Sequence, residues 1–165
     1  MVRRFRPDPV SDALVDRLLR TAMRAPSAGN TQPWAFVVVR DAALRRKLGR
    51  AAIGQMWLSD APLVLVPCAD PSRARQYGDR AHRYARIDTA FASLLLLLAV
   101  AEEGLGACFV GAFNDAEVAR LLRLPADVQP LALIPIGHPA ERPAPQPLRD
   151  PSAAVHRERW GKPRR

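Results

Sequence analysis

The chain has 165 residues, of which 48% are hydrophobic and 25% charged, which suits one globular domain with a sizeable core. Its formal net charge of +9 comes almost entirely from arginine, since Lys47 and Lys162 are the only lysines. The arginines are scattered, and no zinc-finger, helix-turn-helix or RNA-recognition signature accompanies them. We therefore favour a solvated basic surface over a nucleic-acid surface.

Two features of the sequence lead us to expect a cytoplasmic protein that contacts no membrane. The basic start is not followed by an apolar segment, so no signal peptide is predicted. The longest apolar run, residues 90–101, is too short to span a bilayer. Cys68 and Cys108 lie in predicted strands without ligand-like spacing, and we interpret them as buried thiols, with a disulfide or redox role as the less favoured alternative.

The spacing of apolar residues predicts the elements in chain order. Ser11 is the expected N-cap of the first helix. The elements of the first half are helix 11–24, loop 25–34, strand 34–39, helix 41–53 and strand 63–66. Residues 70–80 fit a loop or an irregular helix. The elements of the second half are a long helix 81–103, strand 108–113, helix 114–122 with Asn114 as its cap, and strand 131–136.

Two segments have distinctive patterns. Residues 91–101 of the long helix are apolar nearly all round, so we expect burial on every side, inside a large core or between subunits. The tail from Ala140 is rich in proline and is expected to be extended, with a short helix over 151–160. We expect this tail to reach across to a second subunit. No linker divides the chain, so residues 1–165 are predicted to form a single domain.

Several catalytic signatures are missing from the sequence. Gly104-Leu105-Gly106 begins a dinucleotide fingerprint but is followed by Phe109 where glycine is needed, and no phosphate-binding loop or Gly-x-Ser-x-Gly elbow occurs. The three histidines lack the spacing of metal ligands. Asp88 adjoins an apolar helix face without a second carboxylate. We predict no metal site and no catalytic side chain, and such an enzyme takes its chemistry from a cofactor.

Residues 25–34 read Ala-Pro-Ser-Ala-Gly-Asn-Thr-Gln-Pro-Trp. They are the most specific of five segments that, in order along the chain, resemble the nitroreductase family of FMN enzymes, and they are similar to that family's flavin loop. The others are residues 2–10, 60–66, 88–113 and 135–139. The resemblance implies an α+β fold, with a mixed central β-sheet of four or five strands flanked by helices and the long helix 81–103 at its centre. It also implies an intertwined homodimer with FMN at the subunit interface.

The resemblance assigns a role to eight residues in binding the cofactor. Arg3 falls where a cation meets the flavin ring near N1 and O2, and its charge would favour the reduced ring. Gly111, with Val110 before it, falls where a backbone N–H faces N5. The remaining positions are Pro26, Ser27 and Asn30 on the flavin loop, usually from the partner subunit, Arg149 near the phosphate, and Gln55, with Trp57, at the other edge of the ring.

The residues also allow interpretations without a ligand. These are a disordered arginine at residue 3, a solvated tail charge at residue 149, a strand bulge at residue 111 and simple turn residues in the 25–34 loop. One departure concerns the phosphate, because family members carry a helix and an Arg-Arg-Ser segment before the equivalent of Val2. Either the true start lies upstream, or FMN binds more weakly, or the phosphate depends on Arg149 and its neighbours. The short 67–88 segment predicts a reduced lid and an open pocket.

The function implied by the resemblance is that of an FMN-dependent oxidoreductase. We expect it to take a hydride from NADH or NADPH and to reduce a small electron-poor acceptor, a nitroaromatic or quinone-like compound, by a ping-pong mechanism. One alternative is a different flavin reaction on the same fold, such as flavin destruction, dehalogenation or deazaflavin-cofactor reduction. Another is a non-enzymatic protein that binds flavin or another anion.

Overall fold

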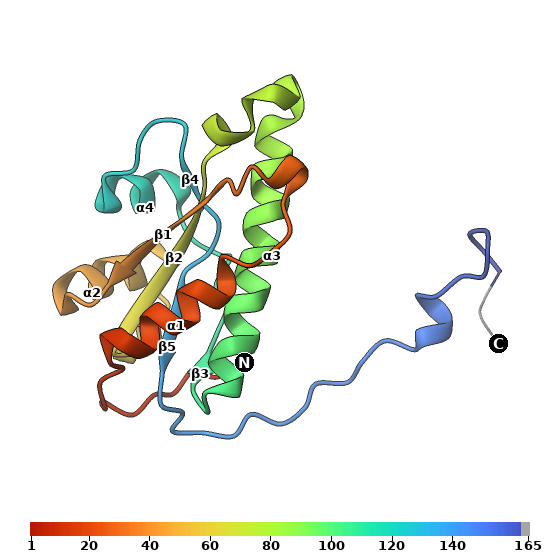
Figure 1. Ribbon diagram of the computed structural model, residues 1–165. Coiled ribbons are helices and arrows are strands. Elements are labelled where there is room, and N and C mark those ends of the chain that lie inside the picture. The colour runs from red at the N-terminus through yellow and green to blue at the C-terminus, as the bar shows by residue number, and fades with distance from the viewer. Residues whose placement is uncertain (163–165) are drawn as a thin grey trace.

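The computed structural model describes residues 1–162, which form a central sheet with helices on both faces and a long tail (Figure 1). The α-helices are α1 (Asp12–Ala22), α2 (Ala42–Ala51), α3 (Ala81–Glu102) and α4 (Asp115–Leu122). The strands are β1 (Trp34–Val39), β2 (Leu63–Ala69), β3 (Gly106–Ala107), β4 (Gln129–Pro130) and β5 (Ile134–Gly137). The 3-10 segments are η1 (Ala28–Asn30), η2 (Met56–Asp60), η3 (Pro71–Arg80) and η4 (Pro151–Ala153).

The sheet is built around β2, whose seven residues are all buried. Its strand order is β1-β2-β5-β3, with β4 pairing β2 beside this path. Alternate residues of β2 face two cores: Leu63 and Leu65 pack with α1 and α3, whereas Val64 and Val66 pack with α2 and α4. The continuous apolar sequence of β2 is therefore explained by helices on both faces of the sheet.

The α+β fold with a long central helix is as the sequence predicted, but the direction of the strands differs. Within residues 1–162 every strand pairing is antiparallel, from β1 with β2 to β3 with β5. The expected mixed sheet is therefore not formed within one chain. Two neighbouring strands are parallel only when a crossover connection returns the chain to the same end of the sheet. Within residues 1–162 no such connection joins two neighbouring strands of this sheet.

The segment between β3 and α4 also departs from its prediction. Residues 108–113 were expected to form a strand, but the sheet pairing ends at Ala107 and resumes only as a single bridge between Val110 and Leu133. Cys108 and Val110 are buried whereas Phe109 and Gly111 are exposed, so the alternation typical of a strand is present without the ladder. The last predicted strand, 131–136, is likewise shifted to β5, with β4 before it.

Helix α3 has two different faces. One packs against α1, the sheet and η3. The other carries Ile87, Phe91, Leu94 and Leu98, which are 39%, 45%, 54% and 58% exposed. The sequence predicted that residues 91–101 would be buried on every side, and within one chain they are not. The stretch Pro71–Glu102 is also long and apolar enough, by length and composition, to cross a membrane, and 44% of its most apolar window is buried inside the domain.

The predicted N-caps and the predicted burial of both cysteines are confirmed. Ser11 and Asn114 accept hydrogen bonds from the N–H groups of Leu14 and Glu117, at 3.3 and 2.9 Å. Cys68 and Cys108 are buried and unpaired. Burial raises the pKa of the Cys68 thiol to about 12, so this thiol is protonated and unreactive at neutral pH.

The tail leaves the body after residue 140 and runs away from it (Figure 1). Its extended form follows from its prolines, as predicted. The expected helix over 151–160 is reduced to η4, because only Pro151–Ala153 take up a helical turn. Trp160 at the far end is 90% exposed and lies against His156.

Candidate functional site

The first residues of the chain lie along the edge of the sheet. The N–H of Val2 donates to the carbonyl of Ala107 at 2.9 Å, and the N–H of Arg3 donates to Glu141 Oε1 at 2.6 Å. This close approach requires glycine at residue 106, since a Cβ there would lie 2.8 Å from Val2. The backbone of Val2 and Arg3 is thus hydrogen-bonded to Ala107 of β3 and to the side chain of Glu141.

The side chain of Arg3 lies over an aromatic ring. Its guanidinium carbon is 5.9 Å from the centre of the Trp57 ring, on η2, near the outer limit of a cation–π contact. Within residues 1–162 the Arg3 guanidinium forms no ion pair. Its charge is therefore available to an anionic or electron-rich ligand.

Gln55 joins this region to the segment after β3. Its side-chain N–H donates to the carbonyl of Ala112 at 3.3 Å. Val110, two residues earlier, is buried and exchanges two backbone hydrogen bonds with Leu133, at 3.0 and 2.9 Å. These contacts hold the backbone of residues 110–112 against the sheet on one side and Gln55 on the other.

Gly111 lies exposed between these fixed points. A Cβ built on it would meet only the Phe109 ring, at the ordinary contact distance of 3.8 Å. In the described part of the chain its N–H donates no hydrogen bond. Gly111 therefore offers a free donor beside open space. We refer to Arg3, Gln55, Trp57, Val110 and Gly111 as the Arg3 cluster.

The 25–34 loop has a tightly defined backbone. Ser27 Oγ accepts the N–H of Gln32 at 3.0 Å, and Asn30 Oδ1 accepts the Gln32 side-chain amide at 3.1 Å. Gly29, Asn30 and Gln32 have φ values of 53°, 55° and 48°, in the left-handed region. Such a conformation costs an ordinary residue about 1 kcal/mol or more, so surrounding contacts must impose it.

Those contacts come from α3 and η3. Asp88 on α3 accepts the N–H of Ala28 at 3.0 Å. Burial raises the pKa of the Asp88 carboxyl, while this hydrogen bond acts in the opposite direction. The Tyr77 hydroxyl of η3 lies directly against Gly29, where it leaves no room for a side chain.

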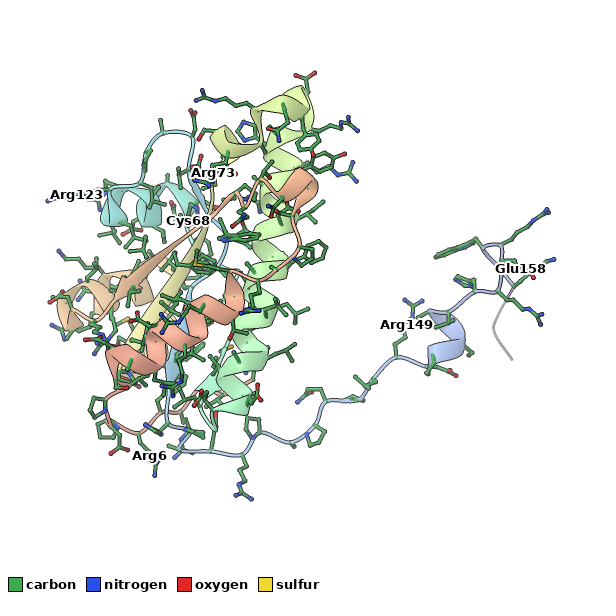
Figure 2. All side chains as sticks on the ribbon, viewed as in Figure 1. Arg6, Cys68, Arg73, Arg123, Arg149 and Glu158 are labelled. Atoms are coloured by element: carbon green, nitrogen blue, oxygen red, sulfur yellow. The ribbon has the colours of Figure 1, made fainter. Side chains whose placement is uncertain are left out.

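The structure thus divides the predicted site residues into three groups. In the Arg3 cluster, Arg3 lies over Trp57, and Gln55 donates to Ala112, next to Val110 and Gly111. Pro26, Ser27 and Asn30 share the 25–34 loop, and no hydrogen bond links this loop to the Arg3 cluster within residues 1–162. Arg149 lies on the tail, away from both groups (Figure 2).

Two contributors were missed from the sequence. Asp88 was noted only for lacking a second carboxylate, and its contact with Ala28 spans 60 positions of the chain. Tyr77 lies in a segment whose pattern was weak. The one sequence signal that could have singled out Asp88 was the position of an acidic residue beside a long apolar run, where burial is expected and a carboxylate needs a partner.

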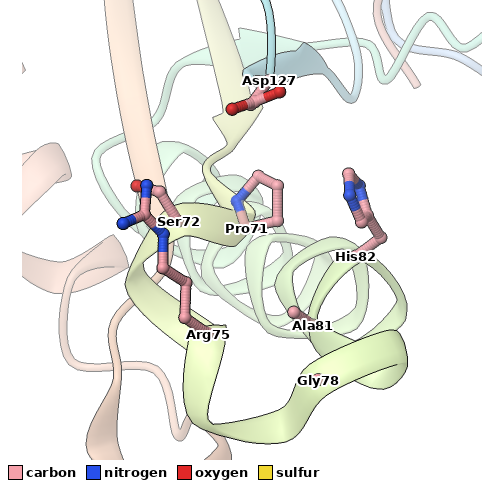
Figure 3. A pocket seen from close by; sticks show the side chains of 7 residues that line it. All are labelled: Pro71, Ser72, Arg75, Gly78, Ala81, His82 and Asp127. Carbon is pink, nitrogen blue, oxygen red and sulfur yellow. The ribbon is translucent and has the colours of Figure 1, made fainter.

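A separate hollow lies beside η3 and the start of α3, with a volume of about 230 Å³ (Figure 3). Its polar lining comes from Ser72, Arg75, His82 and Asp127. None of the predicted flavin residues lines it. Among residues 1–162 no group of three or more histidine, cysteine, aspartate or glutamate side chains is arranged to hold a metal.

The sequence pattern of the nitroreductase family matches residues 1–73 and 57–138. The chain belongs to the nitroreductase family. Its relatives include an NADH dehydrogenase of Thermus thermophilus, 36% identical, with 85% of this chain and 82% of that protein covered. The FMN reductase [NAD(P)H] of Bacillus subtilis is 30% identical, with 96% of this chain and 70% of that protein covered.

Solved structures place the chain in the nitroreductase fold. The NADPH:FMN oxidoreductase of Vibrio harveyi, solved in complex with NAD+, superposes with a TM-score of 0.90 at 25% identity. The match covers 98% of this chain and 71% of the Vibrio chain. The resemblance inferred from the five sequence segments and the α+β nitroreductase fold that it implied are both confirmed.

Proposed function

We propose that this nitroreductase-family chain is an FMN-dependent NAD(P)H oxidoreductase. The observation that carries the proposal is the Arg3 cluster, in which the Arg3 guanidinium forms no ion pair within residues 1–162 and the exposed Gly111 has a free N–H. Relatives named as an FMN reductase and an NADPH:FMN oxidoreductase support it. When bound, FMN supplies hydride chemistry, accepting two electrons from NAD(P)H and passing them to an acceptor.

The residues of the Arg3 cluster fit the needs of a flavin ring. The Arg3 guanidinium would face the pyrimidine edge, where negative charge develops, and its proximity would stabilise that charge. The Gly111 N–H would donate to the N5 edge, and the missing side chain leaves room for a flat substrate to stack. Gln55 would bind the opposite edge while its contact with Ala112 orients the backbone. Val110 holds this backbone against the sheet.

We further propose that the complete site needs two copies of the chain. Pro26, Ser27 and Asn30 would reach the flavin of a second copy, which accounts for their separation from the Arg3 cluster in one chain. The exposed apolar face of α3 supplies a surface for this homodimer, because such a face is costly to leave in water. The tail would carry Arg149 to the phosphate, and residues 1–165 would act as one flavin-binding domain that reaches its partner.

We propose that NADH or NADPH and a small electron-poor acceptor occupy the same open face in turn. A nitroaromatic or a quinone is flat enough to stack beside Gly111. The reaction is then ping-pong, with the first product leaving before the acceptor binds. The two unpaired cysteines suit a reducing compartment, and we place the protein in the cytoplasm.

Steady-state kinetics test this proposal. Initial rates are measured on FMN-saturated protein with varied NADH or NADPH at several fixed concentrations of a quinone and of a nitroaromatic compound. Parallel lines in double-reciprocal plots are expected, since donor and acceptor never share the site. Intersecting lines would contradict the shared face, and no oxidation of either nucleotide would point instead to a flavin-binding protein without this activity.

A further inference from the structure

Helix α3 buries three polar side chains, Asp88, Thr89 and Ser93. Ser93 stays within the helix, because its hydroxyl donates to the carbonyl of Thr89 at 2.8 Å. Asp88 differs, since it is only 4% exposed and accepts a hydrogen bond from the backbone N–H of Ala28, outside the helix. A carboxylate in such a place is costly unless a partner compensates for its lost hydration.

Ala28 is the first residue of η1 and lies between Ser27 and Asn30, two of the proposed flavin contacts. The residues that follow it, Gly29 and Asn30, are both left-handed. Other contacts hold the loop nearer its end, such as the bond from the Asp70 N–H to the carbonyl of Pro33, at 2.7 Å. Among the described side chains, only that of Asp88 reaches the amide that opens η1.

We propose that Asp88 is a positioning residue, which fixes the 25–34 loop so that Ser27 and Asn30 present their polar groups to the flavin. This inference rests on the proposed function. Asp88 would not touch the cofactor, because its carboxylate is turned to the Ala28 amide from the core side of the loop. Its effect on binding would pass through the backbone of η1.

A purely structural role is a poorer explanation for this side chain. Burial raises the pKa of Asp88, which means that its ionised form costs folding free energy rather than contributing to it. Ala92, one helical turn later, packs with Ala25 and Trp34 of the same loop, so apolar contact alone can join α3 to the loop. What the carboxylate adds is a fixed acceptor for one particular amide.

The test compares three variants by fluorescence titration of FMN. Asp88→Ala removes the acceptor, Asp88→Asn keeps an oxygen acceptor without charge, and Ser93→Ala is the matched control, a buried polar residue of α3 that does not reach the loop. We expect Asp88→Ala to weaken FMN binding about tenfold, or about 1.4 kcal/mol. Asp88→Asn should restore most of the affinity, and Ser93→Ala should bind as the unchanged protein does.

A second measurement needs no cofactor. Amide hydrogen exchange at Ala28, followed by NMR in FMN-free protein, should be slow in the unchanged protein and faster in Asp88→Ala. Rapid exchange at Ala28 in the unchanged protein would overturn the inference even if Asp88→Ala failed to fold. So would unaltered FMN affinity in Asp88→Ala, or an equal loss in Ser93→Ala.

The two measurements also separate this inference from the function on which it rests. If the unchanged protein binds no FMN, the proposed function fails first, and the inference fails as a statement about flavin. If FMN binds and is reduced by NAD(P)H but Asp88→Ala binds it equally well, only the role of Asp88 is overturned.

Discussion

Gly111 is a residue at which ligand binding and folding can be separated by one substitution. Its φ lies outside the left-handed region, and an added Cβ would meet only Phe109. Gly111→Leu should therefore shift the melting temperature by less than about 2 °C, as surface substitutions usually do. The new side chain would occupy the space in which the ring and substrate stack, so kcat/KM for NAD(P)H should fall at least about tenfold.

Gly104→Leu is a suitable contrast to this variant. Gly104 has a φ of 69° and nothing within 4 Å of an added Cβ, so leucine there would strain the backbone without touching the Arg3 cluster. It should lower the melting temperature and leave kcat/KM close to that of the unchanged protein. A Gly111→Leu variant that keeps full activity would contradict the proposed stacking face.

The charge of Arg3 carries a second prediction. Arg3→Gln should lower kcat/KM about tenfold or more, because the negative charge of the reduced ring would lose its counter-charge. Arg3→Lys should recover part of the rate, since lysine keeps the charge without the planar fork. The neighbouring Arg4, whose side chain forms no ion pair within residues 1–162, provides the control, and Arg4→Gln should have little effect.

The flavin potential makes the Arg3 test sharper. If the charge acts as proposed, FMN bound to Arg3→Gln should have a lower reduction potential than FMN bound to the unchanged protein. Equal potentials and equal rates in Arg3→Gln and Arg4→Gln would contradict the role of Arg3.

At the scale of single residues, the sequence could single out only those positions that belong to a local motif. Arg3, Gln55 and Gly111 were chosen from separate segments. In the structure Arg3 lies over Trp57 and Gln55 donates to Ala112, next to Gly111, while their roles toward the flavin stay predictions. Asp88 was not chosen, because its importance comes from an amide 60 positions away. A local pattern contains no information about such a contact, which exists only after α3 and the 25–34 loop have packed.

At the scale of elements, helices with caps were predicted most reliably. Ser11 and Asn114 cap α1 and α4 as predicted. A cap can be recognised in the sequence because its side chain and the N–H group that it accepts are only three residues apart. Residues 108–113 were assigned wrongly because their alternation of buried and exposed side chains is real but their ladder is missing. Whether a strand forms depends on a neighbouring strand, which the segment itself does not specify.

Helix α3 carries a prediction about pH. Because burial raises the pKa of Asp88, the folded protein holds this proton more tightly than the unfolded chain, whose carboxyl titrates near about 3.9. The contribution of Asp88 to stability is then complete below the unfolded pKa and is lost as pH rises through the folded pKa. Asp88→Asn does not titrate and should escape this loss.

Thermal unfolding of FMN-free protein checks this expectation. The melting temperature of the unchanged protein, minus that of Asp88→Asn, should decrease as pH rises above about 3.9 and become constant above the pKa of Asp88 in the folded protein. A difference that increases with pH would mean that the folded protein stabilises the ionised carboxylate, contrary to the effect of burial.

At the scale of the whole molecule, the proposed dimer would bring a second copy of the chain against the exposed face of α3 and the extended tail. Leu94 and Leu98 are the most exposed residues of this face, each more than half exposed. Leu94→Asp should convert the proposed dimer into a monomer, because burying an unpaired charge in an apolar interface is strongly unfavourable. It should weaken FMN binding as well, since each site would lose the loop of the other copy.

Light scattering coupled to gel filtration measures the mass of the particle in solution and so distinguishes a dimer from a monomer. Val38→Asp serves as the control, because Val38 is an exposed apolar residue, 40% accessible, on strand β1 rather than on α3. It should leave the mass at that of the dimer. A monomeric unchanged protein that binds FMN fully would contradict the composite site.

The most direct test of the central claim is the visible spectrum of the purified protein after incubation with FMN and desalting, followed by anaerobic NADH or NADPH. The account predicts a yellow protein that retains flavin in proportion to the chain and is bleached by at least one of the two nucleotides. A colourless protein, or a yellow one that neither nucleotide bleaches, would contradict the assignment of an FMN-dependent NAD(P)H oxidoreductase.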